Sequence, residues 1–98
     1  MRKFEWDENK NFKNKMKHRI SFEEAIAVFE DTRAVRIYDE EHSEEEERFL
    51  IIGFDFKTRH LSVCHCYRGK NEEIIRIISA RRATKSERKL YREENNIL

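Results

Sequence analysis

Proline is absent from this 98-residue sequence, and glycine occurs only as Gly53 and Gly69. So few backbone breakers exclude a Pro- or Gly-rich linker and a low-complexity tail. No run approaches the roughly 18–20 apolar residues that span a membrane, and the N-terminus lacks the apolar core of a secretory signal. We therefore expect a cytoplasmic location.

Cysteine is also scarce, with Cys64 and Cys66 in one short apolar run. Cysteines two positions apart on a strand hold their β-carbons too far apart for a disulfide, so two reduced thiols in a reducing compartment are expected. Together with His60 and His65 they include metal-ligand types. Successive side chains of a strand point to opposite faces, however, and no second ligand cluster exists, so neither a metal site nor a cofactor is expected.

Charged residues make up 42% of the sequence and hydrophobic residues 38%, which predicts a thin core beneath a densely ionic surface. The length suits one domain, residues 1–98. The net charge of +1 hides a segregation, because residues 21–50 are strongly acidic whereas residues 76–92 contain one acidic side chain, Glu87. Such a local positive field can attract a polyanion, and it would equally suit an acidic protein.

Residue patterns predict the element order β-α-α-β-β-β-β-α. Strands are expected at residues 3–6, 34–38, 48–56, 60–68 and 73–80, and helices at 8–17, 22–30 and 85–94. Asp7 is the expected N-cap of the first helix, and Ser21 and Thr84 open capping boxes for the other two. The fold class is therefore α+β, with a meandering antiparallel sheet packed against two N-terminal helices and one C-terminal helix.

Aromatic residues of the N-terminal third are interpreted as core. These are Phe4, Trp6, Phe12, Phe22 and Phe29, with Met16 on the same helix face as Phe12 because the two are four residues apart. The acidic run 44–47 is interpreted as a solvated turn, with contact to a partner as the alternative.

The basic side chains gather where the last predicted strand passes into the last helix. Arg81 and Arg82 follow the strand, and the free N–H groups of the helix N-terminus favour anions. Arginine suits phosphate because its planar fork donates two parallel hydrogen bonds. Glu87 and Tyr91 are four residues apart and share a helix face, which brings a proton acceptor and a phenolic donor together.

This inventory suits RNA cleavage without a metal. The 2′-hydroxyl must lose a proton, the phosphorane gains charge, and the leaving 5′-oxygen needs a proton. A well-aimed cation contributes roughly 3 kcal/mol to such a reaction, and acid–base groups contribute about 10²–10⁴-fold. We interpret Glu87 as the base and Tyr91 as the acid. The alternative is a solvated charged helix whose glutamate serves only as a cap.

Lys17 and His18 lie where the first helix is expected to end. Cations there complement the helix dipole, which is a sufficient structural reason for them. A role at the functional site is the alternative.

Several motifs resemble those of the BrnT toxins, and they occur in order across nearly the whole chain. They are Phe4–Asp7, Lys17–His18, Ser21–Ala25, His42–Ser43, Glu46–Phe49 and Arg76–Thr84, followed by Glu87, Arg88 and Tyr91. The block from residue 76 to residue 91 is the most specific part of the resemblance.

The resemblance implies a RelE-like ribonuclease toxin of a type II toxin–antitoxin system, which inhibits translation and growth. It implies a partner of the BrnA type, a DNA-binding antitoxin that neutralises the toxin and represses the shared operon, so that DNA is contacted only through the antitoxin. The expected catalytic neighbourhood comprises Arg81, Arg82, Glu87, Arg88 and Tyr91. The expected RNA-binding residues are Arg76, Lys85, Lys89, Lys17 and His18.

The chain departs from the BrnT pattern at Arg19, where the family usually has glycine after the Lys-His pair. Glycine there would supply a left-handed helix C-cap, and arginine in that conformation costs about 1 kcal/mol. Either the backbone differs locally or the packing absorbs the strain. A second hypothesis for the whole chain is a non-catalytic module whose basic segment docks an acidic protein or a nucleic acid.

Overall fold

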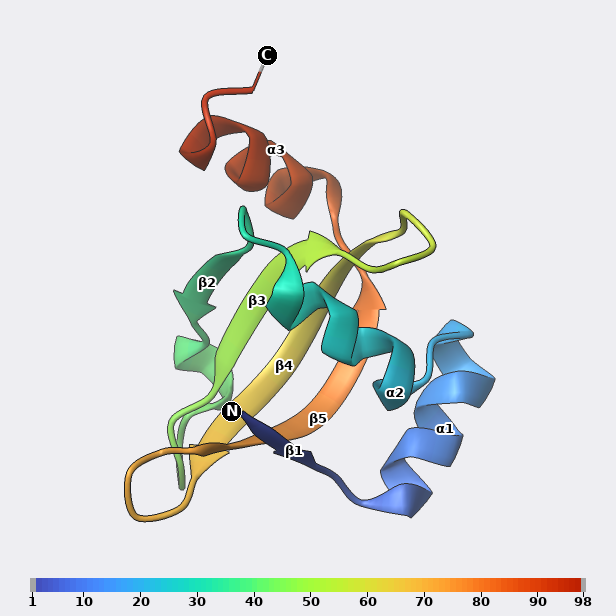
Figure 1. Ribbon diagram of the computed structural model, residues 1–98, viewed down its shortest axis with the longest axis vertical. Coiled ribbons are helices and arrows are strands. Elements are labelled where there is room, and N and C mark those ends of the chain that lie inside the picture. The colour runs from blue at the N-terminus through green and yellow to red at the C-terminus, as the bar shows by residue number, and fades with distance from the viewer. Residues whose placement is uncertain (1, 98) are drawn as a thin grey trace.

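A computed structural model describes residues 2–97 of the chain. Its strands are β1 (Lys3–Glu5), β2 (Val35–Tyr38), β3 (Phe49–Phe54), β4 (His60–Arg68) and β5 (Ile74–Arg82). Its helices are α1 (Glu8–His18), α2 (Phe22–Ala25) and α3 (Lys85–Glu94), with 3-10 helices η1 (Ile26–Glu30) and η2 (Glu40–His42). Figure 1 shows α2 lying across the sheet, α1 beside β5, and α3 beyond one end of the strands.

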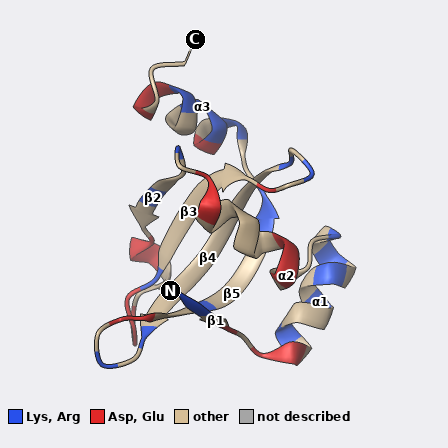
Figure 2. Ribbon diagram, in the orientation of Figure 1, with Lys and Arg blue, Asp and Glu red and all other residues tan. Residues whose placement is uncertain are grey.

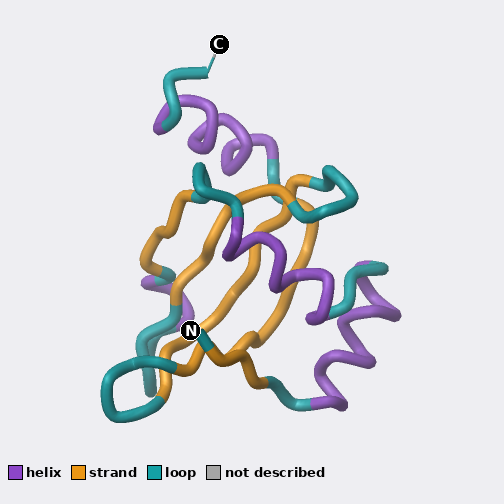
Figure 3. Tube along the Cα trace, in the orientation of Figure 1, coloured by secondary structure: helices purple, strands orange, loops and turns teal. Residues whose placement is uncertain are grey.

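The five strands form one sheet in the order β1-β5-β4-β3-β2. The α+β class is thus confirmed, but the expectation of a purely antiparallel sheet is wrong, because β1 pairs with β5 in parallel. The other three pairings are antiparallel. Hairpins impose antiparallel pairing only on strands adjacent in sequence, and β1 is joined to β5 through the rest of the chain (Figure 3).

The two faces of the sheet pack against different helices. Ile51 belongs to the main core cluster with Phe22 and Val28, whereas its neighbour Ile52 belongs to a smaller cluster with Ala83 and Tyr91. Since successive residues of a strand point to opposite faces, α2 and η1 cover one face and α3 covers part of the other. Most of the aromatic residues predicted as core pack against the main cluster or lie within it.

The second predicted helix is not one continuous α-helix. Its capping box at Ser21 is confirmed, but the α-helix ends at Ala25 and the chain continues as the tighter η1. This tighter segment lies close to β3 at Gly53, where an added β-carbon would come within 2.9 Å of Asp31 and 3.1 Å of Val28. Glycine is needed there for this close approach, which brings Asp31 against the end of β3.

The buried face of α1 is polar, contrary to the sequence prediction. Phe12 is 62% exposed, and Met16 also faces solvent, whereas Asn11 and Asn14 are buried. Asn14 donates to the carbonyls of Ile20 and Ala80 at 2.9 and 2.8 Å, and accepts from the Ala80 N–H at 3.0 Å. The short β1 ends opposite Arg76, so the outer edge of β5 beyond it needs another partner. An asparagine supplies both a donor and an acceptor there, which phenylalanine cannot.

Arg19 ends α1 in the left-handed conformation, with φ 61° and ψ 29°. Its N–H donates to the Lys15 carbonyl at 2.9 Å, and its own carbonyl accepts from Arg59 at 3.2 Å. The backbone therefore keeps the turn that glycine would favour, and these contacts hold it. None of the helices in the described part of the chain has the length and apolar character needed to cross a membrane.

We expect Asn14→Ala to destabilise the fold by about 2–3 kcal/mol, because it leaves buried backbone groups without partners. Asn9→Ala, on the exposed side of the same helix, serves as the control and should change stability by less than about 0.5 kcal/mol. Urea unfolding monitored by circular dichroism measures both. Equal stabilities of the two variants would show that Asn14 does not hold α1 to β5.

Candidate functional site

The site begins where β5 passes directly into α3. The strand extends through Arg81 and Arg82, two residues further than the sequence pattern indicated, and Ala83 alone separates it from the helix cap. Thr84 caps α3 as predicted, since its hydroxyl accepts from the Glu87 N–H and its own N–H donates to the Glu87 carboxylate at 2.8 Å. The arginines are therefore fixed by the sheet rather than carried on a loop. Figure 2 shows positive residues at this junction and along α3.

Arg81 and Glu87 form a two-pronged ion pair. Nη1 and Nη2 of Arg81 donate to the two carboxylate oxygens of Glu87 at 2.8 and 3.0 Å. Burial alone would raise the pKa of Glu87, but the hydrogen bonds from Arg81 and from the Thr84 N–H outweigh it and hold this pKa below its ordinary value. The pair likewise raises the pKa of Arg81. Glu87 is thus an ionised support for Arg81, with both oxygens engaged.

The hydroxyl of Tyr91 bonds to Asp31 rather than to that pair. Its side chain is 4% exposed, and its hydroxyl donates to Oδ2 of Asp31 at 2.9 Å. Burial, reinforced by Asp31, raises the pKa of Tyr91 to about 12. The ring packs edge-on against His60 and Phe54. These contacts anchor α3 to the end of η1, the end of β3 and the start of β4.

The other predicted residues of α3 present cations to solvent. Lys85 and Lys89 are exposed, and half-buried Arg88 donates to the Ala83 carbonyl at 2.8 Å. Arg82 is exposed at the end of β5. The structure thus groups these four residues around the helix N-terminus.

Of the more distant predicted residues, His18 lies near the junction and Arg76 does not. Asn14 of α1 bonds to the backbone of Ala80, the residue before Arg81. Burial lowers the pKa of half-buried His18, and the charges of Lys17 and Arg81 lower it further. Arg76 pairs instead with Glu5 at 2.8 Å, far back along β5. Arg76 and Arg81 pair with Cys66 and Ser62, four positions apart on β4, so at about 3.3 Å per residue they lie about 13 Å apart.

A cavity of about 340 Å³ opens on the sheet face opposite α2, with Arg81 on its wall. Its floor is formed by Leu50 and Cys64, which pair across β3 and β4. A β-bulge in β5 lets Ile78 and Ser79 both line it, because the register shifts between Cys64 and His65. Bulges often re-aim side chains beside functional sites. Burial raises the pKa of Cys64 to about 11, so its thiol is a poor nucleophile.

The connection between β2 and β3, which includes η2, contributes Asp39, Glu41, His42 and Arg48 to the lining of the same cavity. This segment is closed by hydrogen bonds at its base. The Asp39 N–H donates to the Arg48 carbonyl at 2.9 Å, and the Ser43 hydroxyl accepts from the Arg48 N–H at 2.9 Å. Within it, Nδ1 of His42 lies 3.0 Å from the Asp39 carboxylate.

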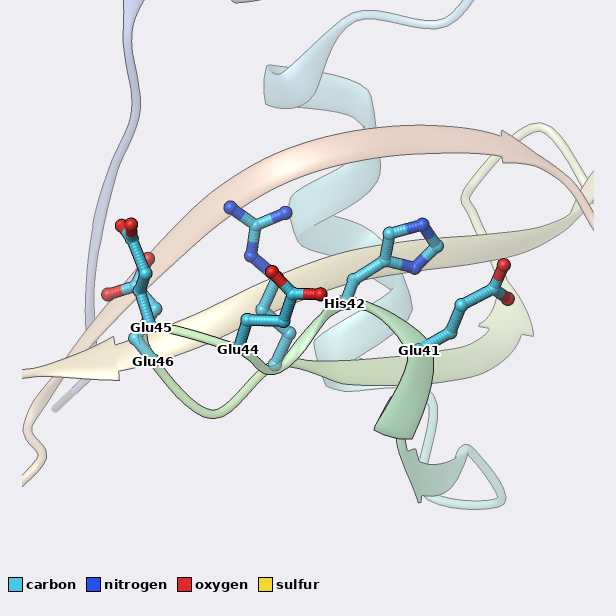
Figure 4. A pocket seen from close by; sticks show the side chains of 6 residues that line it. Glu41, His42, Glu44, Glu45 and Glu46 are labelled. Atoms are coloured by element: carbon cyan, nitrogen blue, oxygen red, sulfur yellow. The ribbon is translucent and has the colours of Figure 1, made fainter.

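The same segment also borders a second hollow, shown in Figure 4, which is lined by Glu41, His42, Glu44, Glu45, Glu46 and Arg48. The acidic run 44–47 is predicted to be a solvated turn. Within it, Glu46 forms an ion pair with Arg68 at 3.1 Å. Across residues 2–97, no group of three or more side chains is arranged to hold a metal ion.

A family model described as the ribonuclease toxin BrnT of type II toxin–antitoxin systems matches residues 6–87. The chain belongs to the BrnT family. The 1.1 Å crystal structure of the Brucella abortus ribonuclease toxin BrnT matches it with a TM-score of 0.66 and 23% identity, covering 87% of this chain and 100% of that chain. No curated protein matches. The family match confirms the resemblance seen in the sequence, and the structural match shows a shared fold. BrnT proteins are ribonuclease toxins, so membership implies an RNA substrate and an antitoxin partner.

The sequence interpretation assigned no role to the η2 wall of the cavity. The sequence nevertheless carries a signal for this segment, because His42–Ser43 and the segment around Arg48 are among the motifs that resemble BrnT. The sequence does not show that the β2–β3 connection lines the same cavity as Arg81.

We expect Glu87→Gln to lower stability at neutral pH, because the amide cannot pair with Arg81 as an anion does. A carboxylate whose folded pKa is depressed stabilises the fold above its unfolded pKa, and that contribution is lost as pH falls through the folded value. The difference in unfolding free energy between wild type and variant should therefore shrink on acidification. A difference that is constant from neutral to acidic pH would contradict the assignment of the ion pair.

Proposed function

We propose that the chain is a single RelE-like domain, residues 1–98, that cleaves RNA without a metal. The observation that carries this proposal is the cavity on the open sheet face, with Arg81 held on its wall by Glu87. A guanidinium held in place before the substrate arrives stabilises developing phosphorane charge without reorganising.

The remaining cations extend this site along the nucleic acid. Arg82 and Arg88, with the N-terminus of α3, are proposed to bind the phosphates next to the cleaved bond. The exposed Lys85 and Lys89 continue that track, while Lys17 and His18 flank it from α1 and Arg76 lies further back along β5. RNA would thus cross the β5–α3 junction.

Glu87 and Tyr91 belong to the proposed site mainly as positioning residues. The carboxylate of Glu87 is committed to Arg81 and the cap of α3, and the hydroxyl of Tyr91 is committed to Asp31. The prediction that they act as base and acid stays a prediction, and their contacts favour holding Arg81 and α3 in place.

We further propose that the activity inhibits translation and growth in the cytoplasm, and that a BrnA-type antitoxin neutralises it. Neutralisation requires the RNA site to be closed, so the antitoxin should cover part of the segment 76–92 or block access to it. In this proposal the toxin contacts DNA only through the antitoxin.

Arg81→Lys keeps the positive charge but loses the two-pronged geometry, so we expect RNA cleavage to fall about 10²-fold or more. Lys70→Ala, in the exposed turn before β5, removes a cation elsewhere and should leave cleavage unchanged. Cleavage of a labelled RNA by purified protein, with a chelator present and absent, measures both variants. Thermal unfolding checks that they are folded.

Activity that depends on added metal would contradict the metal-independent reaction. If the wild type binds RNA with strong salt dependence but leaves it intact, both free and on translating ribosomes, the chain is a non-catalytic binding module.

A further inference from the structure

The two residues of α3 predicted to act as base and acid, Glu87 and Tyr91, are both engaged in hydrogen bonds. Both oxygens of Glu87 accept hydrogen bonds from Arg81, and one of them also accepts from the Thr84 N–H. The hydroxyl of Tyr91 donates to half-buried Asp31. Cleavage at a 2′-hydroxyl nevertheless needs a base within reach of the phosphate held by Arg81.

His42 and Arg81 line the same cavity. His42 comes from η2, and Arg81 comes from β5. The side chain of His42 is 58% exposed, whereas that of Asp39 beneath it is only 11% exposed. Nδ1 of His42 lies 3.0 and 3.2 Å from the two oxygens of Asp39. Because a carboxylate only accepts, Nδ1 carries the hydrogen and Nε2 keeps a free lone pair. A carboxylate that fixes the imidazole tautomer in this way is the arrangement that prepares a histidine as a base.

The base of the η2 segment is fixed by backbone bonds, so the dyad is held in place. The His42 N–H donates to the Asp39 carbonyl at 3.3 Å, and Ser43 bridges Asp39 to Arg48. The charged groups that border the imidazole in its two hollows are the carboxylates of Asp39, Glu41, Glu44, Glu45 and Glu46 and the guanidinium groups of Arg48 and Arg81.

We propose that His42 is a catalytic residue of the site and accepts the proton of the attacking 2′-hydroxyl, with Asp39 as its positioning residue. This inference rests on the proposed ribonuclease function. The 2′-oxygen gives its proton to Nε2 and bonds to phosphorus, and the bond from phosphorus to the 5′-oxygen breaks. The products are a 2′,3′-cyclic phosphate and a 5′-hydroxyl, whose proton comes from water. The resulting hydroxide then takes the proton from the imidazolium.

The test compares wild type with His42→Asn, whose amide can still donate to Asp39 but has no titratable nitrogen. Glu40→Gln, on the same 3-10 helix but outside both hollows, is the control. Single-turnover cleavage of a short RNA is measured between about pH 5 and 9, where imidazoles titrate. We expect His42→Asn to lose about 100-fold or more in rate. It should also lose the rise in rate with pH that the wild type and Glu40→Gln share, while binding of a 2′-O-methyl RNA changes less than about twofold.

The outcomes separate this inference from the function it rests on. If the wild type does not cleave RNA, the ribonuclease proposal itself fails, and His42 loses its role with it. If the wild type cleaves and His42→Asn cleaves equally fast, only the role of His42 is overturned. Rescue of the variant by a 5′-thio leaving group would also overturn it, because His42 would then be the proton donor. So would an affinity loss that equals the rate loss, because His42 would then only bind phosphate.

Discussion

The ion pair between Arg81 and Glu87 joins the three parts on which the site depends. It connects the end of strand β5, the N-cap of α3 and the lining of the open cavity. Because Glu87 also accepts from the Thr84 N–H, the capping box that starts α3 is the same feature that aims the guanidinium. Losing either partner would leave a partly buried charge unpaired. Stability and the position of the cation that we propose to be catalytic are therefore coupled at this residue pair.

Polar contacts also decide how the other helices sit. Asn14 supplies to β5 the donor and acceptor that a further strand would have supplied, which leaves Phe12 on the outside of α1. Asp31, brought close by η1 at Gly53, receives the hydroxyl of Tyr91 and the N–H of Phe54. These contacts fix α1 and α3 against a thin core, as expected for a chain in which charged residues outnumber hydrophobic ones.

Local signals predicted local features well. The caps at Asp7, Ser21 and Thr84 and the strand at residues 60–68 are set by short-range chemistry, and the structure confirms them. Features that depend on contacts between distant parts of the chain could not be predicted from local residue patterns. The parallel pairing of β1 with β5 and the inward face of Asn14 depend on partners dozens of residues away. The cavity was missed for the same reason, since η2 and β5 meet only in the folded sheet.

A crystal structure with a short 2′-O-methyl RNA bound would test the central claim directly, because the blocked nucleophile prevents cleavage. We predict that one backbone phosphate lies in the open sheet-face cavity, with the Arg81 guanidinium on one side and the His42 imidazole on the other. The bond between Arg81 and Glu87 should remain intact in that complex. An RNA bound only along the exposed lysines of α3, with the cavity empty of phosphate, would contradict it.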